Sequence, residues 1–314
     1  MTKAVKWLII VLFAAVLVYM AYFSYSVYRF SININSDSLS DRFQGMKEQA
    51  VNFQPPEWDG NSRVNVLVMG GDARGLKKGE IPRSDTLLVA SIDPSTKKGV
   101  LFSVMRDTWV AIPGHGHDRV NTALSIGGPK LAMETVGNLL GIPIQYYVYT
   151  DFQGFIALVN SLGGVPIEVE KDMNYVDNAD GNRFDIHLKK GLQNLNGEQA
   201  LQYVRFRHDA RSDFARTERQ RTFLKALADQ LRTTTGIMKL PQMLTVVSPY
   251  VETNMEFSQL LQLTSLAYQA KDDTITGIQI PPMTLLKETT KRGAAVLDAD
   301  PEQLKSFVQE AFSK

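Results

Sequence analysis

The sequence predicts an α/β fold in which helices cover both faces of a sheet, preceded by one N-terminal transmembrane helix. From about residue 63 onward, short apolar runs alternate with helical patterns. This alternation is typical of strands and helices that follow each other in a covered sheet. Before residue 30, by contrast, a single long uncharged run dominates the chain.

Composition limits the classes of function that are open to the chain. With 314 residues, 44% of them apolar and 21% charged, the chain can form one large domain or two small ones. Its formal net charge of +1 gives no global field for nucleic acid, so any basic site must be local. The absence of cysteine excludes disulfides, thiolate metal sites and a cysteine nucleophile.

No charged residue occurs between Trp7 and Tyr28. A helix of this length spans about 30 Å, the thickness of a bilayer core. Lys3 and Lys6 precede the run, which favours a cytoplasmic N-terminus. We therefore expect a cytoplasmic tail over residues 1–6, an anchor over 7–28 and a stalk over 29–60.

A cleaved signal peptide is the competing interpretation of this segment. Its apolar region is usually shorter, and it ends at small residues. The tyrosine-rich end of the run suits a retained anchor better, because aromatic side chains favour the membrane boundary. The expected protein is a single-pass type II protein of the cell membrane, with its main domain outside the cytoplasm.

Apolar periodicity places the remaining elements in order. Strands are expected over residues 64–69, 86–92, 100–105, 143–150, 165–169 and 275–280. Helices are expected over residues 127–140, 152–162, 217–232 and 258–270, and from 301 onward, and residues 198–206 run from helix into an extended segment. We assign residues 61–235 to the main domain and 236–314 to an α/β extension packed on it.

Charged residues stand at three of the expected strand ends. Asp72 follows the first strand, Arg83 and Asp85 precede the second, and Arg106 and Asp107 follow the third. Taken singly, each is more often a solvated loop residue or part of a weak surface pair. The repetition favours a function, since rigid strand ends aim side chains into a shared crevice.

Arginines gather in the segment that follows. Arg205 and Arg207 are two residues apart and share one face if the backbone is extended. In the next helix, Arg216 and Gln220 lie on the apolar stripe, so both are expected to point inward. Arg219 and Arg221 leave that stripe and are expected at the surface.

Together these residues suit a diphosphate. Arginine forks bind phosphate oxygens in bidentate fashion, and Mg²⁺ is held by one or two carboxylates plus phosphate oxygens. Asp72 and Asp85 fit the carboxylate requirement. The chain lacks glycine-rich nucleotide motifs and a GxSxG elbow. His115, His117 and Asp118 mimic a metal site, but an exposed turn explains them better.

The ordered motifs resemble the LytR–CpsA–Psr (LCP) family over about residues 63–232. The resemblance rests on six motifs: Gly-Gly-Asp72, Arg83-Ser-Asp-Thr, Met-Arg106-Asp-Thr, Arg119-Val-Asn121, Tyr-Val-Arg205-Phe-Arg207 and Asp213-Phe-Ala-Arg216-Thr-Glu-Arg219-Gln220-Arg221. It implies an α-β-α sandwich with a central mixed sheet. It also implies a transferase that moves an anionic glycopolymer, such as teichoic acid or capsule, from undecaprenyl diphosphate to peptidoglycan. The implied acceptor is the C6 hydroxyl of N-acetylmuramic acid.

Carried over by position, the resemblance gives each site residue an expected role. Asp72 and Asp85 resemble the pair associated with Mg²⁺ (or Mn²⁺). The expected diphosphate site comprises Arg83, Arg106, Arg119, Arg205, Arg207, Asp213, Arg216 and Gln220. Asp85, Arg106 and Asp107 are the expected catalytic residues, and either Asp85 or Asp107 is expected to deprotonate the acceptor or fix an arginine.

The family also holds its prenyl chain in an apolar groove. The helices at 127–140 and 152–162 are candidates for its walls, although ordinary core packing fits them equally well. Three other functions stay open: hydrolysis of the lipid diphosphate, a membrane-linked transcriptional attenuator and a non-catalytic surface-binding module. The expected topology opposes the attenuator, because about six cytoplasmic residues cannot form a helix-turn-helix.

Overall fold

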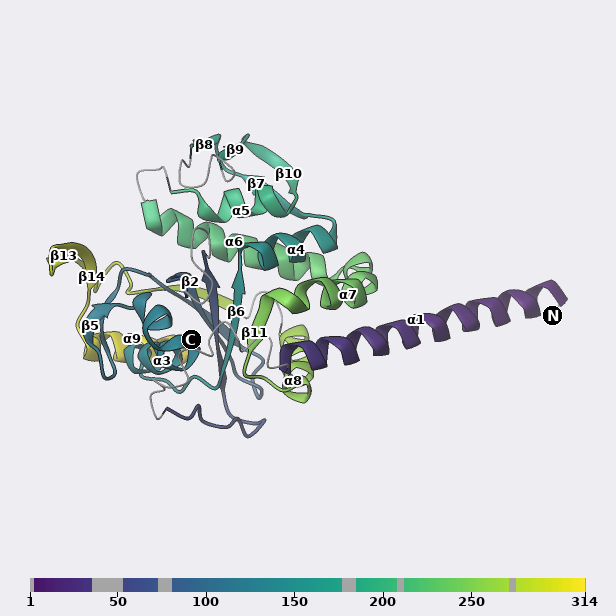
Figure 1. Ribbon diagram of the computed structural model, residues 1–314, viewed down its shortest axis with the longest axis horizontal. Coiled ribbons are helices and arrows are strands. Elements are labelled where there is room, and N and C mark those ends of the chain that lie inside the picture. The colour runs from purple at the N-terminus through teal and green to yellow at the C-terminus, as the bar shows by residue number, and fades with distance from the viewer. Residues whose placement is uncertain are drawn as a thin grey trace.

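The computed structural model describes residues 3–35, 53–72, 81–176, 185–207, 212–270 and 275–313. Its centre is a six-stranded sheet in the order β11-β6-β1-β2-β3-β12 (Figure 1). The strands of this sheet are β1 (Val64–Gly71), β2 (Ser84–Ile92), β3 (Gly99–Val104), β6 (Tyr146–Asp151), β11 (Val251–Thr253) and β12 (Ile275–Ile280).

The sheet is mixed. β1 runs antiparallel to β2 and parallel to β6. β3 runs antiparallel to β2 and parallel to β12, and β11 closes the other edge antiparallel to β6. β11 and β12, which come late in the chain, therefore belong to the same sheet as β1. This arrangement confirms the predicted α/β fold with a central mixed sheet.

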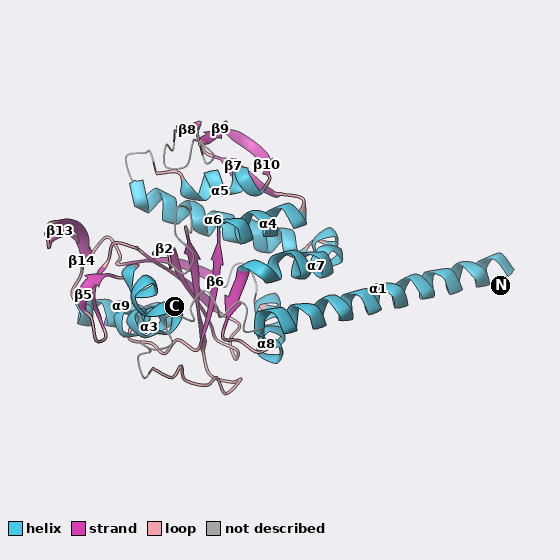
Figure 2. Ribbon diagram, in the orientation of Figure 1, coloured by secondary structure: helices cyan, strands magenta, loops and turns pink. Residues whose placement is uncertain are grey.

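Helices cover both faces of the sheet, as Figure 2 shows. On one face, α3 (Thr122–Leu140) and α9 (Pro301–Ser313) bury Leu131 and Leu304 in the core beneath the sheet. The other face carries α4 (Phe152–Leu162), α5 (Gly197–Arg205), α6 (Ser212–Arg232) and α7 (Thr234–Val247). These helices form a second apolar cluster, which includes Val159 and Phe223.

Smaller elements surround this framework. In the described part of the chain, four two-stranded ribbons are formed. They pair β4 (Trp109–Ile112) with β5 (Gly116–Arg119), β7 (Val165–Val169) with β10 (Gly191–Leu195), β8 (Met173–Tyr175) with β9 (Ile186–Leu188), and β13 (Lys287–Lys291) with β14 (Ala294–Asp298). A short 3₁₀ helix, η3 (Ser248–Tyr250), precedes β11, and α8 (Phe257–Gln269) follows it.

The predicted bounds of α4, β7 and β12 agree with the structure. Several elements were missed, among them α7 and the ribbons β4–β5 and β13–β14. The extended segment expected around Arg205 was wrong, because α5 continues through that residue and an Asn196 capping box fixes its start. Helix α3 begins earlier than predicted, at Thr122, and is kinked at Gly127 and Gly128.

The N-terminal helix α1 (Lys3–Asn35) projects from the body of the molecule (Figure 1). Its C-terminal end contacts α7 and η3: Phe30 is buried there, and Asn33 Nδ2 donates a hydrogen bond to Ser248 Oγ at 3.0 Å. Among the helices of the described residues, none has the length and apolar character that crossing a membrane demands. The predicted transmembrane segment stays a prediction. Most of the predicted stalk, residues 36–52, lies outside the described part of the chain.

Candidate active site

The sheet topology gathers the predicted site at one edge. β1, β3 and β6 run in the same direction, so their C-terminal ends lie together, and the antiparallel β2 begins at that edge. Gly71, next to Asp72, pairs with Ser84 on one side and with Asp151 on the other. Charged residues from separate motifs are thereby brought within reach of each other.

A cavity of about 700 Å³ opens between this edge and helices α4–α7. Its polar wall consists of Asp72, Asp85, Arg106, Asp151, Arg205, Arg207, Arg216 and Gln220. Its apolar wall includes Phe152, Phe155 and Leu158 of α4, Leu201 and Val204 of α5, Phe223, Leu224 and Leu227 of α6, Val247 of α7 and Val251 of β11. One cavity therefore combines a charged site with an extensive apolar surface.

Helix α6 shows how the two walls are joined. Arg216 and Gln220 line the cavity near the strand ends, and Phe223 and Leu227 line it further along the same helix. From Arg216 to Leu227 the helix rises about 16 Å. The cavity thus changes from charged to apolar along α6, which suits an amphiphile with an anionic head and a hydrocarbon tail.

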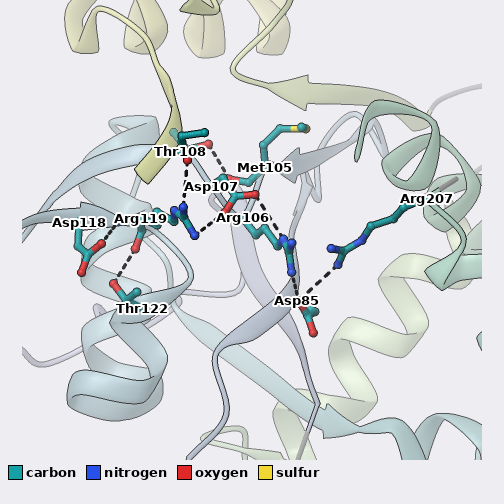
Figure 3. Close-up of polar contacts among 10 residues, drawn as sticks. Asp85, Met105, Arg106, Asp107, Thr108, Asp118, Arg119, Thr122 and Arg207 are labelled. Carbon is teal, nitrogen blue, oxygen red and sulfur yellow. Dashed lines mark hydrogen bonds and ion pairs between the residues drawn. The ribbon is translucent and has the colours of Figure 1, made fainter. Parts of the chain in front are cut away.

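Five side chains form a chain of alternating charge, drawn in Figure 3. Asp85 Oδ1 lies 2.5 Å from Arg106 Nη1 and 3.6 Å from Arg207 Nη2. Asp107 bridges the next two arginines, with 3.4 Å from Oδ2 to Arg106 Nε and 3.4 Å from Oδ1 to Arg119 Nη1. Among these five side chains, three guanidinium groups alternate with two carboxylates, so the cationic groups outnumber the anionic ones.

Two further cavity residues are fixed by side-chain contacts. Gln220 Nε2 donates a hydrogen bond to Thr86 Oγ1 at 3.1 Å, which ties α6 to the start of β2. The guanidinium carbon of Arg205 lies 5.1 Å from the centre of the Phe152 ring, within range of a cation–π contact. Arg216 is 4% exposed. The buried or stacked arginines of this cavity keep little rotamer freedom, so they are held ready for a ligand.

Not every predicted site residue lines the cavity. Arg83 is exposed, and Asp107 contacts arginines rather than the cavity. Arg119 lies on β5, where its guanidinium reaches Asp107 and the backbone oxygen of Ala295 at 3.1 Å. The side chain of Asp213 lies outside the described residues. Asp107 therefore contacts Arg106 on the side away from the cavity, and Arg119 in turn contacts Asp107.

The prediction that Arg219 lies at the surface was wrong. Arg219 is 3% exposed, because α6 is covered by β7 as well as by the sheet. Its Nε lies 2.7 Å from Glu170 Oε1, and its Nη1 donates to the backbone oxygen of Phe206 at 2.7 Å. Arg221 is half-buried and donates to Ser103 Oγ at 3.3 Å, and burial lowers the pKa of its guanidinium.

Asp151 is a cavity residue that the sequence reasoning missed. It ends β6 and caps α4, where its Oδ1 accepts a hydrogen bond from the Gly154 amide at 3.0 Å. A sequence signal existed: an aspartate stood between a predicted strand and a predicted helix, which is a preferred N-cap position. Of the two helices proposed as groove walls, α4 lines the cavity, whereas α3 contributes no lining residue and packs on the opposite face of the sheet.

The donor set suits a hard cation held jointly with a phosphate. Asp72 and Asp85 line the same cavity, and no group of three or more acidic, histidine or cysteine side chains forms a metal site within the described ranges. Mg²⁺ is usually held by one or two protein carboxylates together with phosphate oxygens, and these two aspartates fit that requirement. His117 lies on β5 stacked against Trp109, and it joins no such group.

The LytR_cpsA_psr family model matches residues 24–313, nearly the whole chain. The chain belongs to the LytR_cpsA_psr family. This match extends well beyond residues 63–232, to which the motif resemblance was limited, and it includes the elements from α7 to α9.

Among the named relatives, some are called regulatory proteins and others are called transferases. The regulatory protein MsrR of Staphylococcus aureus is 35% identical over 224 residues, which cover 70% of this chain and 65% of MsrR. TagV of Bacillus subtilis, named a polyisoprenyl-teichoic acid–peptidoglycan teichoic acid transferase, is 34% identical over 265 residues, covering 83% of this chain and 66% of TagV. The chain thus spans about two thirds of the length of these relatives.

A solved structure of TagT bound to LIIa-WTA shares the fold. It superposes with a TM-score of 0.67 at 27% identity, over 83% of this chain and 96% of that one. The mixed sheet and its two helical layers are therefore those of the LytR_cpsA_psr proteins.

Proposed function

We propose that this protein transfers an anionic glycopolymer from a polyprenyl diphosphate, undecaprenyl diphosphate in the family pattern, to a peptidoglycan hydroxyl. The observation that carries the proposal is the single cavity in which a cluster of arginines and aspartates adjoins an apolar wall. Such a cavity suits a diphosphate attached to a hydrocarbon tail. The name of the relative TagV supports the same class of reaction.

In the proposed reaction, a hydroxyl oxygen of peptidoglycan attacks the phosphorus atom that bears the glycopolymer. A new phosphorus–oxygen bond forms, the diphosphate bridge breaks, and polyprenyl monophosphate leaves with the negative charge. Arg106, Arg205 and Arg207 line the cavity where this charge develops, and their guanidinium groups would stabilise it. Arg216 and Gln220 would hold the non-reacting phosphate oxygens.

The hydroxyl proton needs an acceptor. Each of the two candidate aspartates is paired with two arginines, but of the two only Asp85 lines the cavity. Asp85 is therefore the better-placed base, and Asp107 the residue that orients Arg106. Asp72 and Asp85 are the residues that would hold Mg²⁺, which when bound would neutralise part of the diphosphate charge.

The sequence further supports a location at the cell membrane, through the uncharged run from Trp7 to Tyr28. In the proposed topology, this run anchors the protein and the cavity lies outside the cytoplasm. A lipid carrier would then be presented near the headgroup level, without leaving the bilayer completely.

The test is a transfer assay with the full chain in detergent micelles. Labelled polyprenyl-diphosphate glycan, peptidoglycan and Mg²⁺ are incubated with the protein, and label is followed into the wall fraction. Label in peptidoglycan supports the proposal, whereas release of free glycan alone would identify a hydrolase. Arg106→Ala is expected to lower the transfer rate by about 100-fold or more while lipid binding is largely kept. Undiminished transfer by this variant would contradict a catalytic role for the cavity.

A further inference from the structure

Arg219 lies directly behind the charged wall of the cavity without lining it. Its guanidinium is shared between two acceptors, the Glu170 carboxylate and the backbone oxygen of Phe206, each at 2.7 Å. The guanidinium carbon also lies 5.1 Å from the centre of the Phe206 ring. Arg219 therefore holds one residue, Phe206, by both its peptide group and its ring.

Phe206 joins Arg205 to Arg207, and both of these arginines line the cavity. It follows the last residue of α5, where backbone oxygens have no partner within the helix. Phe206 is 3% exposed, and Lys171 Nζ lies 5.4 Å from the centre of its ring. Fixing this residue fixes the point from which both cavity arginines extend.

We propose that Arg219 is a positioning residue, which acts through Phe206 to hold Arg205 and Arg207 in place for the anionic head of the ligand. This rests on the proposed function, because it assumes that the two arginines bind a diphosphate. Arg219 does not line the cavity, so it would act through other residues rather than by contact with the ligand. Its effect is to keep the two charged side chains preorganised, so that binding does not have to order them.

The chemistry of the contact requires arginine. A guanidinium presents several donors in a planar fork, so it reaches a carboxylate and a carbonyl at the same time. Lysine offers a point charge and would keep only part of this arrangement. The side chain of Glu170 is 48% exposed, so its carboxylate stays hydrated when Arg219 is replaced. Arg219→Gln and Arg219→Lys are therefore expected to fold.

The test separates the binding of the head from the binding of the tail. The full chain in detergent micelles is titrated with a short polyprenol and with the diphosphate of the same polyprenol, and the ratio of the two dissociation constants measures the head alone. Arg219→Gln is expected to lower this preference by about tenfold, with polyprenol affinity unchanged, because the charge-assisted contacts of the head lose their alignment. The preference of Arg219→Lys for the diphosphate is expected to lie between that of the wild type and that of Arg219→Gln.

Arg63 supplies a matched control. It also combines an ion pair, 3.6 Å from Asp93, with a ring contact, 4.2 Å from Phe312, but it precedes β1 at the opposite end of the strand from the cavity. Arg63→Gln is expected to leave the preference for the diphosphate unchanged. A loss of preference shared by Arg63→Gln and Arg219→Gln would reflect general loosening of the fold and would overturn the proposal.

A mutant cycle decides whether Arg219 acts through the two arginines. In an Arg205→Ala/Arg207→Ala background, Arg219→Gln is expected to cause no further loss of diphosphate preference. Additive losses, or an unchanged preference in Arg219→Gln and Arg219→Lys alone, would overturn the positioning role and leave the proposed function standing. A wild-type chain that binds polyprenol and diphosphate equally well would overturn the proposed function, and this inference with it.

Discussion

At the scale of single residues, Gly71 shows how closely the strand-end edge is packed. A β-carbon at this position would lie 2.6 Å from Tyr149 Oη and 2.8 Å from Pro82 Cγ. Gly71→Ala is expected to destabilise the fold by about 1–3 kcal/mol, because neighbouring groups must move to accept it. Urea unfolding measures the loss. Adding Tyr149→Phe removes one of the clashing atoms and should restore part of the lost stability. No recovery would show that the contact with Tyr149 does not cause the destabilisation.

Residue-scale roles were only partly accessible from the sequence. The motifs identified Asp85, Arg106 and Arg216 as members of one site, since strand ends and helical phase constrain where such side chains point. They misplaced Arg219, because the helical stripe reveals only the face toward the sheet. On a second face, α6 packs against β7, which lies about fifty residues earlier in the chain. A local sequence pattern carries no information about that contact.

At the scale of elements, the turn between β2 and β3 predicts that the stability of the fold depends on pH. The Ser95 hydroxyl, followed by the Ser95 and Thr96 amides, lowers the pKa of Asp93 from 3.8 to about 2. Because the folded-state pKa is depressed, the turn stabilises the fold above pH 3.8, and this contribution is lost as the pH falls toward about 2. The free energies of unfolding of the wild type and of Asp93→Asn should differ near neutral pH and become similar in acid. A constant difference would contradict the assignment.

Elements with a strong periodic pattern were predicted well, and α4, with its glycine stop, is an example. The ribbons were not, because each is short and stabilised by partners distant in sequence: β14 reaches Asp107 through the Leu297 amide at 3.0 Å. The end of α5 was misread for a related reason. Its YVRFR sequence has high β-propensity, but the Asn196 capping box and burial against α4 favour a helix.

At the scale of the whole molecule, the last helix is part of the main core. Leu304 of α9 is fully buried against the sheet and α3. Leu304→Ala is expected to cost about 2–5 kcal/mol of unfolding free energy in a single cooperative transition. Leu261→Ala on α8, where the side chain is 52% exposed, should change stability by about 0.5 kcal/mol or less. Separate unfolding of residues 236–314 would contradict one common core.

The proposed membrane anchor gives a second prediction at this scale. The full chain should remain with membranes after washing with high salt and dissolve in detergent, because burial of the run from Trp7 to Tyr28 is apolar rather than ionic. Replacing two leucines of the run, Leu12→Arg and Leu17→Arg, should release it. Release of the unaltered chain by salt alone would argue for a peripheral association.

The position of β12 also bears on the order in which this protein can fold. β3 is made well before β12, yet β12 is its partner along the whole of Gly99–Val104 on the edge away from β2. Until Ile275–Ile280 arrives, the newly made chain carries an apolar strand with an open hydrogen-bonding edge, which is a template for association with other chains. Interrupted synthesis or proteolysis before residue 275 should therefore give aggregates, which would place the risk of association in the interval between the synthesis of β3 and that of β12.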